Sequence, residues 1–258
     1  MPSPADTAYM ASDPPGMPWL GMALEHKLYP LAGRAAPWFA AAAALLCALA
    51  LYIGFFRLPH EIVLGEHYRI LLIHLPASWM ALFIYCAMAA AAGVGLFGPH
   101  RLSAMVASAL APTGGVFAFL ALWTGSLWGK PSWGVWWVWD AQLTCALLLL
   151  ALFLAVVMLQ TALDDARRAD RAAAVLILSG LIALPVVYAS VMRWSSAPHG
   201  TLLVPSLGPG TLDTLLGGML VMGAGLIAYT VAAALTRLQT VILERERRSE
   251  WAVRLAGE

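Results

Sequence analysis

The stretch "AQLTCALLLLALFLAVVMLQ", residues Ala141 to Gln160, contains no charged side chain. An α-helix needs about 20 mostly apolar residues to cross the hydrocarbon core of a bilayer, which is about 30 Å thick. This stretch therefore predicts a membrane-spanning helix. The whole chain agrees with that interpretation, because 61% of its 258 residues are hydrophobic and 11% are charged. Such a composition excludes an ordinary soluble globular domain.

Five other apolar stretches meet the same length requirement: Pro37 to Phe56, Leu75 to Phe97, Ala104 to Gly125, Ala172 to Met192 and Leu212 to Thr236. We therefore predict an all-α membrane protein with six transmembrane helices. We expect residues 1–36 to form an N-terminal cytoplasmic tail and residues 37–236 to form the six-helix domain. Residues 237–258 are expected to form a cytoplasmic C-terminal helix or tail.

The distribution of lysine and arginine predicts the orientation, because basic residues in short loops stay on the cytoplasmic side. One side of the predicted bundle carries most of them: Lys27, Arg34, Arg101, Arg167, Arg168, Arg171, Arg237, Arg245, Arg247, Arg248 and Arg254. The other side carries Arg57, Arg69, Lys130 and Arg193. With an even number of spans, both termini are expected in the cytoplasm, and the loop between spans three and four is expected outside.

That external loop, residues 126–140, includes the tryptophan-rich stretch "WGKPSWGVWWVWD" (residues 128–140). We expect Gly129, Pro131 and Gly134 to prevent a continuous helix here. An aromatic belt at the headgroup level is one explanation of the tryptophans, although a belt needs fewer of them. Indole rings also offer a wide, rigid contact area, so a platform for a large planar ligand such as a tetrapyrrole is favoured.

Histidines on the same side are candidate axial ligands, since imidazole is a common protein ligand of haem iron. The predicted outer loops hold His60, His67, His74 and His199. We predict His74 and His199 as the ligand pair, because they flank the tryptophan loop from the first and third outer loops. His60 and His67 compete with His74 for the first ligand position. A structural or solvated histidine is the alternative for each of them.

Charged residues near the loop have two possible roles. Haem propionates need cationic partners, and we predict Arg69 and Lys130 for this role. Arg57 and Arg193 are placed where side chains at span ends reach toward water. Asp140 immediately precedes the fourth span, where it either caps the helix or orients a residue of the site.

The motif "WGVWWVWD" (residues 133–140) resembles the WGxxWxWD signature of the WWD-motif haem-handling membrane protein superfamily. Trp133, Gly134, Trp137, Trp139 and Asp140 occupy the fixed positions. The stretches "YRILLIHLPAS" and "WDAQLT", together with six spans, resemble one branch in particular, the haem exporter protein C (CcmC) family of cytochrome c maturation. The resemblance covers nearly all of the membrane portion.

The resemblance implies that the chain holds non-covalent haem b at the periplasmic face of a bacterial inner membrane and presents it to a membrane-anchored haem chaperone. It maps the axial iron ligands onto His74 and His199. The macrocycle contacts would be Trp128, Trp133, Trp136, Trp137 and Trp139. The implied partners are an ABC-type ATP-binding subunit, a second membrane subunit and a very small membrane protein. ATP hydrolysis would occur in the separate subunit, so the chain itself is not expected to be an enzyme.

Two other classes of function were compared with this interpretation. A haem-ligating cytochrome c synthase-type enzyme would need further spans or a large external domain, and the sequence ends soon after the sixth apolar stretch. A bis-histidine membrane electron-transfer cytochrome would need paired histidines near the cytoplasm, where the sequence places His26 and His100. The sequence also shows no basic aromatic surface for nucleic acid.

Overall fold

The computed structural model describes residues 18–60, 65–97, 101–194 and 207–246. Every regular element in these ranges is helical. The long helices are α2 (Pro18–Tyr52), α3 (Leu71–Phe97), α4 (Arg101–Trp133), α5 (Ala141–Ala162), α6 (Ala166–Trp194) and α7 (Pro209–Glu246). All six contain a window that is long and apolar enough to cross a membrane. The prediction of an all-α protein with six membrane-spanning helices is confirmed.

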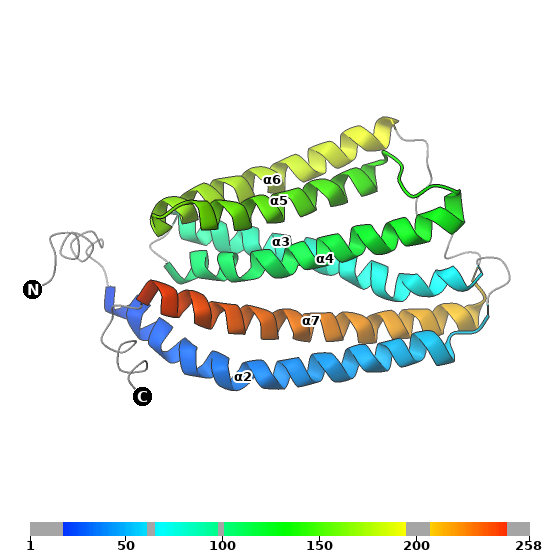
Figure 1. Cartoon of the computed structure of the whole chain (residues 1–258), viewed down its shortest axis with the longest axis horizontal. Coiled ribbons are helices and arrows are strands. Elements are labelled where there is room, and N and C mark those ends of the chain that lie inside the picture. The colour runs from blue at the N-terminus through cyan, green and yellow to red at the C-terminus, as the bar shows by residue number, and fades with distance from the viewer. Residues whose placement is uncertain (1–17, 61–64, 98–100, 195–206, 247–258) are drawn as a thin grey trace, which may run out of the picture.

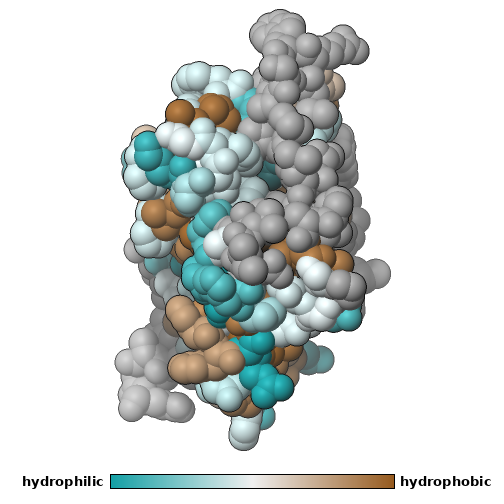
Figure 2. Space-filling view, turned by 90° about the vertical axis from the view of Figure 1, so that its right-hand side faces the viewer, coloured by the Kyte–Doolittle hydropathy of each residue, from teal (hydrophilic) through white to brown (hydrophobic). Residues whose placement is uncertain are grey.

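The helices run up and down along one common axis (Figure 1). α2 and α7 pack against each other on one side of the bundle, α5 and α6 lie on the other side, and α3 and α4 lie between these pairs. The beginning of α2 and the end of α7 lie at the same end of the bundle. The connection from α4 to α5 lies at the opposite end, which we call the outer end. Figure 2 looks onto the outer end and shows polar and apolar side chains side by side.

The middle of the bundle is held together by close helix contacts. The Tyr85 hydroxyl on α3 donates to the carbonyl of Ile177 on α6 over 2.9 Å. The Tyr85 ring meets Phe153 on α5 edge to face, with ring centroids 5.4 Å apart. Phe153 in turn packs onto Gly114 of α4, where any Cβ would overlap the phenyl ring. Small residues at such crossings let helices approach closely, and packing of this kind stabilises helix association in a bilayer.

Two short helices shape the connection from α2 to α3. η1 (Ile53–Arg57) is a π-helix that continues α2, and η2 (Glu66–Ile70) is a 3-10 helix that leads into α3. Arg69 of η2 donates to the carbonyls of Gly54 over 2.5 Å and of Leu58 over 2.9 Å. Carbonyls at a helix end lack partners within their own helix, so Arg69 ties the end of the first long helix to the start of the next.

The first and last long helices extend beyond the predicted spans at the end opposite the tryptophan loop. α2 begins at Pro18, inside the segment expected to be a tail, and α7 continues to Glu246. The two extensions stabilise each other, because Gln239 of α7 donates to the carbonyl of Tyr29 over 2.9 Å. Arg245 further binds Asp170 of α6 through two bonds of 2.6 and 2.7 Å. Tertiary pairing therefore extends α2 past the limits that hydropathy indicates.

Candidate functional site: a histidine-lined cavity beneath the tryptophan loop

A cavity of about 370 Å³ lies between the outer halves of four helices, α3, α4, α5 and α7. Most of its lining is aliphatic, from residues such as Leu71, Leu122 and Leu215. The polar or partly polar side chains that line it are His74, Ser78, Gln142, Trp79, Trp128 and Trp133. Sites for small molecules have volumes of about 300–1,000 Å³ and combine apolar walls with a few polar groups. The cavity fits that description.

His74 is held in the cavity wall by α4. Its Nδ1 atom lies 3.0 Å from the Thr124 hydroxyl oxygen, and Thr124 is 4% exposed. The imidazole also lies against Gly125, where an added Cβ would be 2.9 Å from the His74 Cε1 atom. A glycine at this position therefore makes room for the ring. One edge of the imidazole faces α4, and the side chain contributes to the cavity surface.

The tryptophan loop begins later than predicted, because α4 continues through Gly129 and Pro131 to Trp133. The expectation that both residues would interrupt the helix is wrong. The ring of Trp133 packs where Gly129 lacks a side chain. Pro131 lies in the final turn of α4, where it removes one N–H donor from the helical hydrogen bonding without ending the helix before Trp133. The helix ends at Gly134, whose φ of +79° favours glycine, and the Gly134 N–H still donates to the Lys130 carbonyl over 2.9 Å.

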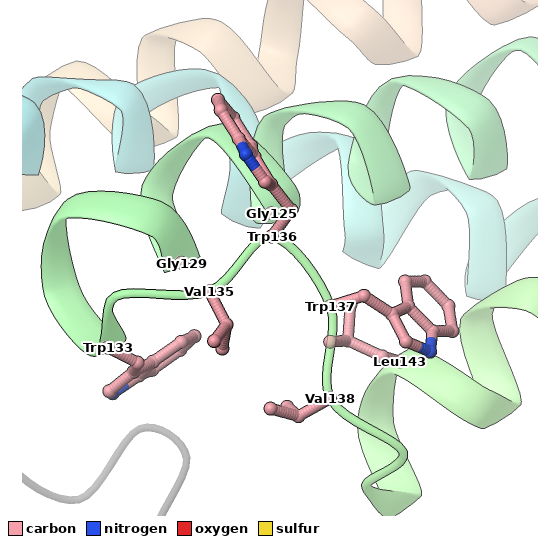
Figure 3. Close-up of a pocket in the computed structure, with 8 residues that line it drawn as sticks. All are labelled: Gly125, Gly129, Trp133, Val135, Trp136, Trp137, Val138 and Leu143. Carbon is pink, nitrogen blue, oxygen red and sulfur yellow. The ribbon is translucent and has the colours of Figure 1, made fainter.

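The tryptophans do not form one flat surface. Trp128 is 8% exposed, lines the cavity and meets Trp133 edge to face at 4.8 Å. Trp137 meets Trp139 in the same manner at 5.3 Å. Figure 3 shows a small pocket lined by Trp133, Trp136 and Trp137, whose rings point in different directions. Trp128 is therefore the buried ring of this group, whereas Trp133, Trp136 and Trp139 present exposed surface at the outer end.

Three buried hydrogen-bond donors of this region have no partner within the described residues: Trp128 Nε1, Ser132 Oγ and Trp137 Nε1. Buried polar groups in proteins are ordinarily hydrogen-bonded, so unpaired donors are typical of sites for a ligand or ordered water. Trp128 is the member of this set that lines the cavity. Its indole N–H is therefore available to a polar group of a bound molecule.

Asp140 caps α5. It is 3% exposed, and its Oδ1 atom accepts a hydrogen bond of 2.7 Å from the Leu143 N–H. The extended backbone of Asp140, with φ −101° and ψ 175°, is typical of a residue that caps a helix N-terminus. The structural role considered from the sequence thus has direct geometric support. The cap also fixes where the tryptophan loop enters α5.

The two predicted cations are placed differently from each other. Lys130 donates to the carbonyl of Gly134 over 2.8 Å, and its Nζ lies 6.0 Å from the centroid of the Trp136 ring. Lys130 therefore lies in the last turn of α4, beside the tryptophan loop. Arg69 does not line the cavity. Its guanidinium binds the end of the first helix and also Glu66, over 2.5 Å.

The remaining histidine candidates are distributed around the rim. His60 pairs with Glu66 on the exposed surface, and His67 lies on η2 beside Gly65. Neither lines the cavity. His199 lies outside the described residues, and so does the Arg193 side chain. Leu207, where the described chain resumes after this gap, is 8% exposed and lines the cavity.

Sequence reasoning did not identify Thr124, Gly125 or Gln142 as part of this region. Gln142 lies on α5 directly after the tryptophan loop, and the other two lie on α4. A hydroxyl within an apolar span is a weak signal, since such groups commonly bond to their own helix or to a neighbour. His74 and Thr124 are 50 positions apart, so only the packing of α3 against α4 reveals that they are partners.

Comparisons with known proteins agree with the resemblance seen in the motif. A family model described as "Heme exporter protein C" matches residues 19–253. A protein of that name from Escherichia coli (strain K12) is 37% identical over 235 residues, which cover 91% of this chain and 94% of the relative. A protein of the same name from Bradyrhizobium diazoefficiens is 38% identical over 234 residues, with 90% and 88% covered. A "Putative cytochrome c biosynthesis ccmC-like mitochondrial protein" from Marchantia polymorpha is 38% identical over 151 residues, with 58% and 64% covered.

Proposed function

Because this chain belongs to the haem exporter protein C family, we propose that it binds haem in the cavity at the outer end and hands it on during cytochrome c maturation. It acts as a subunit of a membrane transport complex rather than as an enzyme. The cargo is non-covalent haem b. The observation that carries this proposal is the position of His74, whose imidazole forms part of the cavity wall beneath the tryptophan loop.

The chemistry of the cavity suits a haem. Its aliphatic walls suit the macrocycle, and a neutral imidazole suits the iron. The unpaired Trp128 N–H is a donor for a propionate or for another polar group of the cargo. Lys130, in the last turn of α4, supplies a positive charge near the rim. Arg69 can reach a propionate only by exchanging its present partners, so we assign Lys130 as the first cationic contact.

His199 is the proposed second axial ligand. It precedes Leu207 by eight positions, and eight extended residues span at most about 28 Å. Because Leu207 lines the cavity, that length of chain allows His199 to approach the iron from the side opposite His74. The two iron ligands then come from separate outer loops. This arrangement suits a haem that must be released after it is bound.

Handover requires that part of the haem stays accessible. The exposed rings of Trp136 and Trp139 lie at the outer end, where a soluble partner domain can reach them. We propose that the receiving partner is a membrane-anchored periplasmic haem chaperone. The other partners are an ABC-type ATP-binding subunit that hydrolyses ATP, a second membrane subunit and a very small membrane protein. The clustering of Lys and Arg toward the opposite end supports an inner-membrane location with the tryptophan loop in the periplasm.

The test is a set of visible spectra of the purified full-length protein, produced in cells with ample haem and recorded with and without dithionite. We compare the wild type with His74→Ala, His199→Ala and the double variant. His60→Ala serves as a matched control, because His60 lies on the same side of the bundle but does not line the cavity. We expect a b-type spectrum that each ligand substitution weakens, that the control leaves unchanged and that added imidazole restores.

Two results would contradict the proposal. A wild-type protein without a Soret band would exclude haem as the cargo. A normal spectrum in the His74→Ala variant, with loss of haem in the His60→Ala variant instead, would move the first ligand from the cavity to the exposed rim.

A further inference from the structure

We propose that Thr124 is a positioning residue for haem binding: its hydroxyl accepts a hydrogen bond from Nδ1–H of His74 and so leaves the Nε2 atom unprotonated for iron. This inference rests on the proposed function, since it assigns a new role within the same site. The sequence comparisons assign no role to Thr124.

The direction of the hydrogen bonds follows from the atoms involved. The Thr124 hydroxyl oxygen lies 2.6 Å from the carbonyl oxygen of Leu120. A carbonyl oxygen only accepts, so a contact this short requires the hydroxyl to donate its single proton to Leu120. The hydroxyl has no second proton for the His74 Nδ1 atom, which lies 3.0 Å from the same oxygen. That bond therefore exists only if Nδ1 carries the proton.

A neutral imidazole with its proton on Nδ1 has a free lone pair on Nε2. Thr124 does not line the cavity, whereas His74 does. The Nδ1 atom thus faces α4 at Thr124, and the His74 side chain belongs to the cavity surface. The chain from Leu120 through Thr124 to His74 therefore selects the tautomer that can ligate iron. Partners of this kind fix ring orientation and raise ligand basicity in metal sites generally.

The hydrogen bonds that join His74, Thr124 and Leu120 also hold the imidazole ring in position. Thr124 is 4% exposed, so bulk water cannot easily replace its hydroxyl. Thr124 and Gly125 are consecutive residues of α4. The Thr124 hydroxyl bonds to Nδ1 of His74, and Gly125 leaves room for the imidazole ring. Ser78, one turn further along α3, donates to the carbonyl of His74 over 2.8 Å, so the backbone of this turn is bonded as well.

The tests use the full-length protein in detergent. The Thr124→Val variant removes the hydroxyl with little change of shape, and Thr124→Ala removes it with less bulk. Thr124→Ser keeps it. Thr230→Val is the matched control, because the hydroxyl of Thr230 is also buried in a membrane helix and bonds to its own helix at Leu226.

The first measurement needs no haem. Nitrogen NMR of protein labelled with ¹⁵N-histidine, with the His74 signals assigned by the His74→Ala variant, reports which ring nitrogen is protonated. We expect Nδ1–H in the wild type, in Thr124→Ser and in Thr230→Val. In Thr124→Val and Thr124→Ala we expect the Nε2–H form to become populated. An Nε2–H tautomer in the wild type would overturn the inference.

The second measurement has two parts. A haem titration gives the haem affinity, and a redox titration of the bound haem gives its midpoint potential. Loss of an outer partner typically lowers metal affinity about 10- to 100-fold, and we expect that loss in Thr124→Val and Thr124→Ala. The midpoint potential should rise, because a less basic imidazole stabilises the ferric state less. Thr124→Ser and Thr230→Val should match the wild type in both quantities.

The outcomes separate the two proposals. If the wild type binds haem through His74 but Thr124→Val and Thr124→Ala keep its affinity and potential, the role of Thr124 is refuted and the proposed function stands. If the wild type binds no haem, the proposed function fails and the ligand role of the pair fails with it.

Discussion

Replacing Gly125 with alanine should weaken haem binding without unfolding the protein. Gly125 lies on α4 against the imidazole of His74, and the added Cβ would be 2.9 Å from Cε1 and 3.5 Å from Nδ1. An ordinary contact between carbon atoms is about 3.5–4.0 Å, so the ring must retreat by about 0.6 Å or more. The backbone of α4 is fixed by its neighbours, which leaves the side chain of His74 to move.

A displacement of this size is significant at a ligand site. Productive geometry in binding sites must be held to within about 0.5 Å, and a side chain forced about 30° off its rotamer costs about 0.5–1.5 kcal/mol. At 1.4 kcal/mol for each tenfold change in affinity, that cost corresponds to haem binding weakened by about 2- to 10-fold. Lengthening of the bond to Thr124 adds to this loss.

The assay is haem titration of the purified Gly125→Ala variant, with thermal melting of the haem-free protein alongside. Gly115→Ala is the matched control on the same helix, since its added Cβ would be an ordinary 3.6 Å from Phe153. Alanine is favoured over glycine inside a helix by about 0.5–1 kcal/mol, so the control should melt no lower than the wild type. Equal haem affinity of the two folded variants would refute the assignment of His74 to the iron.

Two other predictions concern Arg69, which the sequence predicts as a propionate partner, and Asp140, for which it leaves a cap and a site role open. Arg69→Gln should lower the melting temperature of the haem-free protein, because the carbonyls of Gly54 and Leu58 lose their donor. Each carbonyl left unpaired lowers the free energy of unfolding by about 1–3 kcal/mol. Loss of haem affinity with unchanged melting would instead indicate a propionate contact. Asp140→Ala should destabilise α5 by about 1 kcal/mol, whereas Asp140→Asn should keep the cap to Leu143 and melt near the wild type. Impaired haem binding in a stable Asp140→Asn variant would show that the charge itself acts in the site.

Some features were predictable because they depend on short stretches of sequence. Six apolar segments of sufficient length predict six spans, and the described helices confirm them. The position of Asp140 directly before an apolar run predicted a helix cap, which the bond to Leu143 supports. Residues 237–258 were expected to form a helix or a tail, and α7 continues beyond residue 236 to Glu246.

Other expectations differed from the structure. Glycine and proline were expected to interrupt the helix after residue 128, yet α4 continues to Trp133, whose ring packs beside Gly129 of the same helix. The first span was expected from about Pro37, and the helix that contains it begins earlier, at Pro18, and pairs through Tyr29 with the extension of α7. Arg69 was predicted as a haem contact from its charge and side of the membrane; it donates to carbonyls of the first helix and the residue after it, and its contact with haem stays a prediction.

By itself, the sequence determined the membrane class, the number of spans, the sidedness expected from charge and the family signature in residues 133–140. These properties depend on composition and on residues close together in the chain, so they can be read without coordinates. Only the tertiary structure decided that His74 meets Thr124 across α3 and α4, that Trp128 faces a cavity and that Arg69 braces α2. Those relations join residues far apart in the chain, and helix packing determines which of them come into contact.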